Sequence, residues 1–321
     1  MALHLVTGGA GFIGSHLTER LLADGHDVRV LDDFSSGKEA NLGFTPSAKG
    51  GRLETLRGDV SDMETARSAV AGVECVFHQA AIPSVPRSIG NPAATHRANA
   101  TGTLNLLIAA CDAKVDRFVY ASSSSVYGDT PTLPKVETMT PAPLSPYAIS
   151  KLSAEHYARV FHRIYGLPTI GLRYFNIFGP RQDPTSQYAA VVPRFITAIA
   201  AGRAPVVYGD GEQTRDFNYV GNAVEANLRA AVCQSSAFGM SFNIACGKRI
   251  SLLELIDRIN GIFGTRIAPV HEESRPGDVK HSLADIAAAE KHLQWRPATG
   301  LDEALRITAD WFSRTTPRAE R

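Results

Sequence analysis

Tyr147 and Lys151 form a Tyr-x-x-x-Lys pair that could carry out acid–base chemistry on an alcohol. Residues four apart on a helix lie on the same face, so the Lys151 ammonium would lie beside the Tyr147 phenol. A neighbouring positive charge favours the phenolate, whereas an ordinary tyrosine, with a pKa of about 10, is a poor base at neutral pH. Such a pair also arises by chance, so its meaning depends on the rest of the chain.

A glycine-rich segment, residues 7–14 (TGGAGFIG), follows a strand pattern and opens a helix pattern, which is the context of a dinucleotide-binding loop. Gly8, Gly11 and Gly14 would allow the tight turn, the approach to the pyrophosphate and the close packing of helix on strand. The amides of Phe12 and Ile13 would lie at the helix amino terminus, where free N–H groups and a partial positive charge attract phosphate.

Asp32 ends the second strand pattern, where a carboxylate accepts hydrogen bonds from the adenosine ribose. This position favours NAD over NADP, because a carboxylate repels the additional phosphate of NADP. Asp33 is the alternative ribose ligand. Asp59 and Val60 follow the third strand pattern and are candidate adenine contacts, although Asp59 could instead be a helix N-cap.

The composition is that of a globular protein without a strong overall charge. In 321 residues, 33 Lys and Arg face 32 Asp and Glu, so no global field attracts nucleic acid or an anionic membrane. The four cysteines lack C-x-x-C spacing, which argues against structural zinc and a disulfide scaffold. No signal-like or membrane-spanning apolar run is evident. We therefore expect a cytoplasmic protein with no metal.

Short apolar runs alternate with amphipathic stretches, a pattern typical of a parallel sheet covered by helices on both faces. Expected strands lie at 3–7, 27–31, 53–57, 75–78, 118–121, 169–174 and 241–245, and expected helices at 13–24, 63–70, 104–112, 147–165, 191–201 and 221–233. The prediction is an α/β fold: a Rossmann-type doubly wound domain at 1–178, to which about 213–248 partly returns. A smaller α/β substrate domain would comprise 179–212 and 249–321.

Several motifs, taken in order, resemble those of the extended short-chain dehydrogenase/reductase family, in its nucleotide-sugar epimerase and dehydratase group. They are TGGAGFIG, HQAA at 78–81, NATGTLN at 99–105, the serine run ending in VYG at 128, Tyr147 with Lys151, and RYFNIFGPR at 173–181. The resemblance covers nearly the whole chain. It implies that Lys151 also binds the nicotinamide ribose, that Ala80, Ala81 and Tyr174 line the cofactor, and that Asn99 bends a helix near the site.

The same resemblance assigns Ser123 as the active-site hydroxyl that hydrogen-bonds the reacting sugar and relays its proton to Tyr147. Dehydratases of the family carry an Asp-Glu pair in this segment and decarboxylases carry a glutamate, whereas this chain has Ser124 and Ser125. Elimination is thus disfavoured. We hypothesise instead that a UDP-sugar is oxidised at its 4-hydroxyl by NAD, turns over as a 4-keto sugar and is reduced on its other face.

Binding of the UDP-sugar is assigned mainly by the resemblance. Arg215 and Arg275 would hold the diphosphate, since guanidinium groups bind phosphate in a bidentate way. Val192, which could instead be plain helix core, and Tyr208 would flank the uracil, while Asn176 would contact the diphosphate or sugar. The other candidate substrate contacts are Ser84, Arg87, Ser124, Gln213 and Ser282.

Ser282 matches a gate position where a tyrosine restricts UDP-hexose 4-epimerases to glucose and galactose and a small residue admits an N-acetyl group. The chain therefore looks most like UDP-N-acetylglucosamine 4-epimerases of the bacterial polysaccharide type, although Pro83 could narrow the acetamido pocket. The alternatives are a UDP-glucuronate 4-epimerase, a reductase or dehydrogenase that releases its product, and a non-catalytic NAD sensor. Helices around 100–112 and 147–165 would form a homodimer, as the family implies.

Overall fold

The centre of the computed structural model, which describes residues 2–44, 50–184, 190–273 and 279–315, is a seven-stranded parallel sheet. The strand order is β11-β6-β5-β4-β1-β2-β3. The strands are β1 (Leu3–Thr7), β2 (Asp27–Asp32), β3 (Leu53–Arg57), β4 (Cys75–His78), β5 (Arg117–Ser123), β6 (Thr169–Tyr174) and β11 (Met240–Ile244). The chain order reverses between β1 and β4, and ligands of such sheets bind beyond the carboxyl ends at that point.

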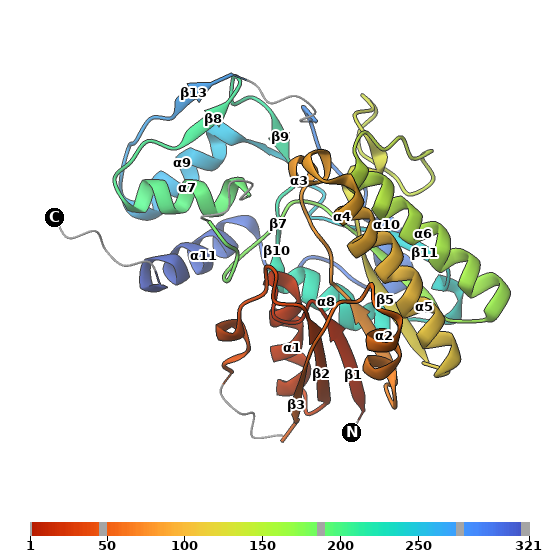
Figure 1. Ribbon diagram of the computed structural model, residues 1–321. Coiled ribbons are helices and arrows are strands. Elements are labelled where there is room, and N and C mark those ends of the chain that lie inside the picture. Colours follow the sequence, from red (N-terminus) through yellow and green to blue (C-terminus); the bar gives the residue numbers. More distant parts are fainter. Residues whose placement is uncertain (1, 45–49, 185–189, 274–278, 316–321) are drawn as a thin grey trace.

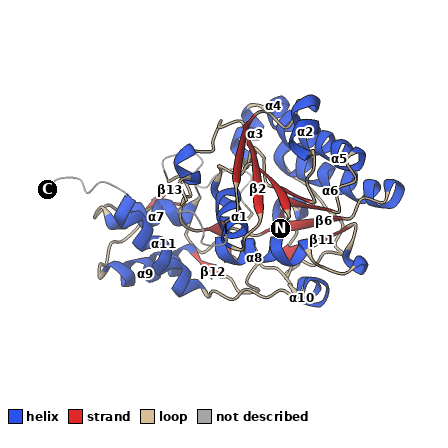
Figure 2. Cartoon of the chain, turned by 90° about the horizontal axis from the view of Figure 1, so that it is seen from below, coloured by secondary structure: helices blue, strands red, loops and turns tan. Residues whose placement is uncertain are grey.

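Helices cover both faces of this sheet, which explains why its central strands are apolar on both sides. One apolar core lies beneath α1 (Phe12–Ala23) and α8 (Val220–Ala231), and a second beneath α2 (Met63–Val70), α5 (Gly102–Asp112) and α6 (Pro146–Tyr165). Figures 1 and 2 show these two groups on opposite sides of the strands. The predicted Rossmann-type doubly wound fold is thus confirmed.

A third apolar core belongs to a smaller lobe at the upper left of Figure 1. It is built from α7 (Val191–Ala200), α9 (Leu252–Phe263) and α11 (Leu301–Thr315), with β8 (Val206–Tyr208) parallel to β13 (Val270–Glu272). The sequence signals of α9 are clear: Ser251 and Glu254 form a capping box, and Gly264 ends the helix in the left-handed conformation.

The remaining elements are short. They are β7 (Ile177–Phe178) beside β10 (Asn218–Tyr219), β9 (Thr214–Arg215) beside β12 (Ile250–Ser251), α3 (Val85–Gly90), α4 (Pro92–His96), the π-helix η2 (Arg97–Thr101), α10 (Ala287–Leu293), and the 3-10 turns η1 (Glu39–Leu42), η3 (Ser124–Tyr127) and η4 (Ser235–Ala237). Two sequence expectations differ: β5 continues to Ser123 rather than ending at Ala121, and helices occupy most of 85–101, where none was predicted.

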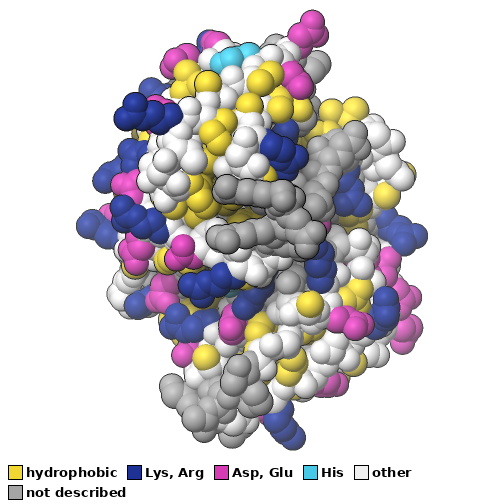
Figure 3. Space-filling model, turned by 90° about the vertical axis from the view of Figure 1, so that its left-hand side faces the viewer, with side chains coloured by type: hydrophobic (Ala, Val, Ile, Leu, Met, Phe, Trp, Pro, Cys, Tyr) yellow, Lys and Arg dark blue, Asp and Glu magenta, His cyan; other side chains and the backbone are white. Residues whose placement is uncertain are grey.

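The surface carries charges of both signs. Figure 3 shows Lys and Arg side chains interspersed with Asp and Glu over the face it presents, in keeping with the formal net charge of +1. All four cysteines are unpaired. Within the described ranges, no helix is long and apolar enough to span a membrane.

Candidate functional site

The helix α6 holds Tyr147 and Lys151 against the carboxyl end of β5. Its start is fixed by Ser145, whose hydroxyl accepts a hydrogen bond from the Ala148 amide at 3.1 Å, and by Pro146 in the first turn. Lys151 is buried, and its Nζ donates to the carbonyl oxygen of Ala121 at 2.9 Å. The hydroxyls of Tyr147 and Ser123 are hydrogen-bonded to each other. The structure therefore brings all three predicted catalytic residues together.

The serine run turns the hydroxyl of Ser123 towards Tyr147. The Oγ of Ser123 accepts from the amide of Ser125 at 3.2 Å and from the Ser125 hydroxyl at 2.9 Å. With its lone pairs engaged in this way, Ser123 keeps its own proton available for donation. Ser124, at the first position of η3, is half-buried next to it.

The pKa shift of Tyr147 differs from the sequence expectation. Burial raises the pKa of Tyr147, and the hydrogen bond from Ser123 lowers it only in part. Burial also lowers the pKa of Lys151 to about 8. The ammonium is engaged by the Ala121 carbonyl, so desolvation of the phenol outweighs the expected effect of a positive charge one turn away. Proximity of Lys151 is therefore not sufficient to make Tyr147 a phenolate.

The glycine loop between β1 and α1 leaves no room for a side chain at Gly8 or Gly14. Gly8 has a φ of +66°, and a Cβ there would lie 2.8 Å from backbone atoms of Ala80. A Cβ on Gly14 would lie 2.1 Å from the Gly8 carbonyl oxygen. Gly11 is the N-cap of α1 and makes no side-chain cap, so the first-turn amides, including those of Phe12 and Ile13, remain for a ligand. This geometry fits a dinucleotide pyrophosphate.

Asp32, rather than Asp33, turns towards this loop. Its two carboxylate oxygens accept from the amides of Ala10 and Phe34, each at 2.9 Å, and burial raises its pKa. Asp33 is exposed and accepts from the amide and hydroxyl of Ser35. Each Asp32 oxygen keeps a further lone pair for a ribose hydroxyl. Of the two candidates that the sequence left open, the geometry favours Asp32.

Replacing Asp32 with Asn is expected to weaken NAD binding about tenfold, because an amide cannot accept from both the Ala10 and Phe34 amides and also loses the charge-assisted bond to ribose. The preference for NAD over NADP should narrow, since the charge that repels the 2′-phosphate is gone. Titration of protein stripped of cofactor measures both effects. Asp33→Asn is the matched control, and a larger effect in that control would contradict the assignment of Asp32.

The other predicted cofactor contacts lie near the same strand ends. The Asp59 carboxylate accepts from the Ser61 amide at 2.8 Å and from Arg97 Nη2 at 2.9 Å. Its alternative interpretation as a helix N-cap is wrong, because Asp62 caps α2 by accepting from Thr65. Val60 is buried, close to Gly102.

Asn99 lies in the π-helix, where its side chain joins two segments of the site. Its Oδ1 accepts from the Ile82 amide at 2.8 Å and its Nδ2 donates to Ser150 Oγ at 3.0 Å. The Ala80 amide donates to Thr7 Oγ1 at 3.2 Å, which ties the segment carrying Ala80 and Ala81 to the end of β1. Tyr174 donates to Gln79 at 3.1 Å on the same edge.

A cavity of about 240 Å³ between the two lobes gathers five of the predicted substrate contacts: Asn176, Val192, Tyr208, Gln213 and Arg215. Val192 both lines this cavity and is buried in the third core, so the two interpretations of it are compatible. Gln213 donates from Nε2 to the Tyr208 carbonyl at 2.7 Å, and its buried Oε1 has no hydrogen-bond partner in the described parts of the chain. That oxygen is available to a donor on a ligand.

The remaining predicted substrate contacts that lie in the described residues are not part of this cavity. Ser84 is the N-cap of α3, accepting from the Arg87 amide at 3.2 Å, and Arg87 is exposed. The Ser282 amide donates to the Thr214 carbonyl at 3.0 Å, which places Ser282 beside the strand that carries Arg215. Arg275 lies outside the described residues.

Sequence reasoning missed Arg194, whose guanidinium lies 5.5 Å from the centre of the Tyr208 ring, and the aromatic wall made by Phe178, Phe195 and Phe217. The only available signal was the position of Arg194 and Phe195 on the same predicted helix as Val192.

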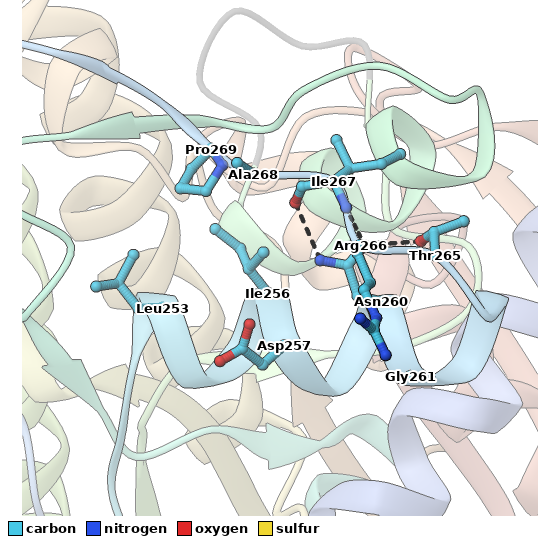
Figure 4. Close-up of a pocket in the computed structure, with 10 residues that line it drawn as sticks. All are labelled: Leu253, Ile256, Asp257, Asn260, Gly261, Thr265, Arg266, Ile267, Ala268 and Pro269. Atoms are coloured by element: carbon cyan, nitrogen blue, oxygen red, sulfur yellow. Dashed lines mark hydrogen bonds between the residues drawn. The ribbon is translucent and has the colours of Figure 1, made fainter.

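A larger hollow, of about 560 Å³, lies on the outer side of α9 (Figure 4). The amide of Asn260 is engaged there by Thr265 and Ile267, so it joins the loop at 265–267 to the helix. The lining contains none of the residues placed in the site above.

Comparisons with known proteins all indicate the same protein family. Residues 4–245 match the model of the NAD dependent epimerase/dehydratase family. A UDP-glucose 4-epimerase from Mycolicibacterium smegmatis is 39% identical over 310 residues, covering 96% of this chain and 97% of the relative. A UDP-glucuronate 4-epimerase from Thermodesulfobacterium geofontis is 32% identical over 322 residues, covering 97% and 96%.

Among solved structures, a UDP-N-acetylglucosamine 4-epimerase from Methanobrevibacter ruminantium M1, in complex with UDP-N-acetylmuramic acid, has a TM-score of 0.92 at 40% identity, covering 98% of this chain and 99% of that one. These similarities extend over the glycine loop, the Ser123–Tyr147–Lys151 group and the cavity between the lobes. The chain belongs to the NAD-dependent epimerase/dehydratase family, and its cofactor is NAD.

Proposed function

We propose that this enzyme interconverts UDP-N-acetylglucosamine and UDP-N-acetylgalactosamine, and also accepts UDP-glucose and UDP-galactose. UDP-sugar 4-epimerisation itself is supported by relatives that cover nearly the whole chain. The observation that carries the proposal is the arrangement at the end of β5. Ser123 and Tyr147 share a hydrogen bond there, and the segment that follows is made of hydroxyls rather than carboxylates.

The cofactor residues fit NAD: the glycine loop would hold the pyrophosphate and Asp32 the ribose. When bound, NAD supplies a reversible hydride acceptor at the 4-carbon of the sugar. Tyr147 receives the 4-hydroxyl proton, directly or through Ser123, and holds it while the sugar is a 4-keto compound. Tyr147 then returns the proton once the sugar has presented its opposite face. Positioning makes both transfers possible, because donor and acceptor atoms must lie within hydrogen-bond reach.

Water elimination and decarboxylation are disfavoured by the chemistry of the serine run. A dehydratase must remove a carbon-bound proton and protonate a leaving hydroxyl, which requires carboxyl groups beside the sugar. Ser124 and Ser125 provide only hydroxyls, and that of Ser125 donates to Ser123. An epimerase needs no additional acid at this position.

The UDP part of the substrate would lie in the cavity between the lobes. Arg215 would pair with the diphosphate, and Tyr208, held by Arg194, would stack on the uracil. The unpartnered Oε1 of Gln213 would accept a hydrogen bond from the nucleoside. We infer that the substrate domain comprises 179–212 and 249–321, and that about 213–248, which carries Gln213 and Arg215 as well as α8 and β11, belongs with the cofactor domain. The pocket then takes residues from both domains.

We also infer a homodimer formed through α6 and its neighbour α5. Ile149, Tyr157, Val160 and Ile164 are between 41% and 67% exposed on α6, which is more apolar surface than a solvated helix normally presents. Sedimentation of the purified protein tests this assembly.

The substrate preference is tested by incubating the protein separately with UDP-N-acetylglucosamine, UDP-glucose and UDP-glucuronate and measuring each 4-epimer. The wild type is expected to act on the acetylated sugar. Ser282→Tyr should lower kcat/KM for that sugar at least about tenfold, because filling a pocket by a few heavy atoms costs discrimination of this order, while UDP-glucose is little affected.

Ser282→Ala is the matched control and should keep both activities. Faster conversion of UDP-glucuronate than of either hexose would replace the proposal by its alternative, a UDP-glucuronate 4-epimerase. Equal loss for both hexoses in Ser282→Tyr would remove Ser282 from the role of gate.

A further inference from the structure

A buried polar row crosses the sheet directly beneath the catalytic residues. It runs from Ser122 on β5 through Arg173 on β6 to Asn243 on β11, which are register partners in adjacent strands. Glu155 of α6 and Tyr127 complete it. All five side chains are buried: Ser122, Tyr127, Glu155, Arg173 and Asn243, hereafter the buried row.

Each member of the buried row bonds to the next. Arg173 binds Glu155 in a bidentate way, from Nε to Oε1 at 2.8 Å and from Nη2 to Oε2 at 2.7 Å. The Ser122 hydroxyl donates to the same Oε1 at 2.5 Å.

On the other side, Arg173 Nη1 donates to the Tyr127 hydroxyl at 2.8 Å, and that hydroxyl donates to Asn243 Oδ1 at 2.7 Å. The network is therefore satisfied along its length, which gives it a single geometry.

The same network makes a ladder between β5 and α6. The Ala121 carbonyl receives Lys151, the Ser122 hydroxyl reaches Glu155, and Ser123 meets Tyr147. Three consecutive strand residues thus contact α6 at positions 147, 151 and 155, each one turn from the next. The contact between Ser122 and Glu155 is adjacent to the hydroxyls of Ser123 and Tyr147, but it includes neither of these two reacting groups.

Stability alone does not explain an ion pair in this place. Removing two charges from water is costly, and apolar replacements of buried pairs are often as stable. A network of directional bonds, however, fixes the relative placement of helix and strand more narrowly than apolar packing does. The reaction needs such placement, because an error of about 1 Å between reacting groups can cost about 100-fold in rate.

We propose that the buried row is a positioning unit which holds the hydroxyl of Ser123 against that of Tyr147, and that Glu155 is the member that joins the row to α6. The inference rests on the proposed epimerase activity. Glu155 and its partners touch neither substrate nor cofactor in this role. They act by fixing the end of β5 on α6.

The test uses variants that remove one hydroxyl each from the full-length, NAD-loaded enzyme. Ser122→Ala deletes the donor to Glu155, and Tyr127→Phe keeps the ring beside Arg173 but breaks the link to Asn243. Ser153→Ala is the matched control, because Ser153 lies on the same helix and its hydroxyl donates to the Ile149 carbonyl rather than to a member of the buried row. For each protein, kcat, KM for the UDP-sugar, NAD content, thermal unfolding and the pH dependence of kcat are measured.

The expected result is a fall in kcat of about tenfold in Ser122→Ala and in Tyr127→Phe, with NAD content and KM unchanged. Because the bond from Ser123 lowers the pKa of Tyr147, loosening it should also move the rise of kcat with pH to higher pH. Ser153→Ala should behave as wild type.

Wild-type kcat and an unshifted pH profile in both variants would overturn the inference while leaving the proposed function intact. So would a fall in kcat that only follows a loss of folded protein or of NAD. A wild-type protein that epimerises no UDP-sugar would overturn the proposed function and this inference together.

Discussion

Tyr147→Phe is expected to lower kcat for 4-epimerisation by a factor of about 1,000, because proton transfer by a positioned side chain contributes about 10² to 10⁴. The phenol at the end of β5 is bonded to Ser123 and lies one turn from Lys151, so it is the group best placed to take the proton. NAD should remain bound, since the glycine loop and Asp32 are unchanged. Product formation and the NAD released on denaturation measure the two effects.

Tyr165→Phe is the matched control, because Tyr165 lies at the end of the same helix with 63% of its surface exposed. It should retain wild-type turnover. Activity of Tyr147→Phe within about tenfold of wild type would move the role of base to another group, with Ser123 the next candidate. Loss of NAD from Tyr147→Phe would instead indicate that the phenol holds the cofactor.

The fold could be predicted because its signals are local. Buried strands appear in the sequence as short apolar runs, and the helices that cover them appear as longer amphipathic stretches, so the two kinds of element can be told apart. The predicted ends of strands were less accurate where pairing with a neighbouring strand extends a strand through residues of low strand propensity. The strand predicted to end at Ala121 continues to Ser123, because Ser122 pairs with Arg173 and Ser123 with Tyr174 on β6. Serine alone gives no strand signal.

The parts of the candidate site that could be predicted are those in which a whole motif lies on a single helix, strand or turn. Gly8, Gly14 and Asp32 follow from the turn and the strand end, and Tyr147 and Lys151 from one helix. The cavity between the lobes was predicted less completely. Tyr208 and Val192 came from the family resemblance, whereas Arg194 was missed because its contact with Tyr208 depends on how α7 packs on β8.

Two further features emerge only in three dimensions. The buried row joins residues far apart in the chain, such as Ser122 and Glu155, so no spacing rule identifies it. The pKa of Tyr147 was expected to fall and instead rises, because burial of the phenol depends on tertiary packing, which a motif does not contain. Both features concern how precisely the catalytic groups are held, which sequence patterns describe poorly.

The second large effect is expected from Gly14→Ala, which should abolish stable NAD binding. A Cβ at position 14 would lie 2.1 Å from the Gly8 carbonyl oxygen and 2.9 Å from the Gly9 Cα, and both are backbone atoms of the loop itself. The loop can make room only by opening, which displaces the amides that face the pyrophosphate. Overpacking of this kind costs about 1 to 3 kcal/mol in stability, so Tm should fall as well.

Gly261→Ala separates this steric effect from the general effect of the substitution. Gly261 lies in α9, and a Cβ added there would meet no neighbouring atom of the described residues within 4 Å. Alanine should therefore stabilise the helix by about 0.5 to 1 kcal/mol and leave NAD binding unchanged. Cofactor content after gel filtration and the Tm of each variant are the measurements. Retention of NAD by folded Gly14→Ala would mean that the loop tolerates a side chain at its tightest point. The pyrophosphate would then have to be held by another part of the chain.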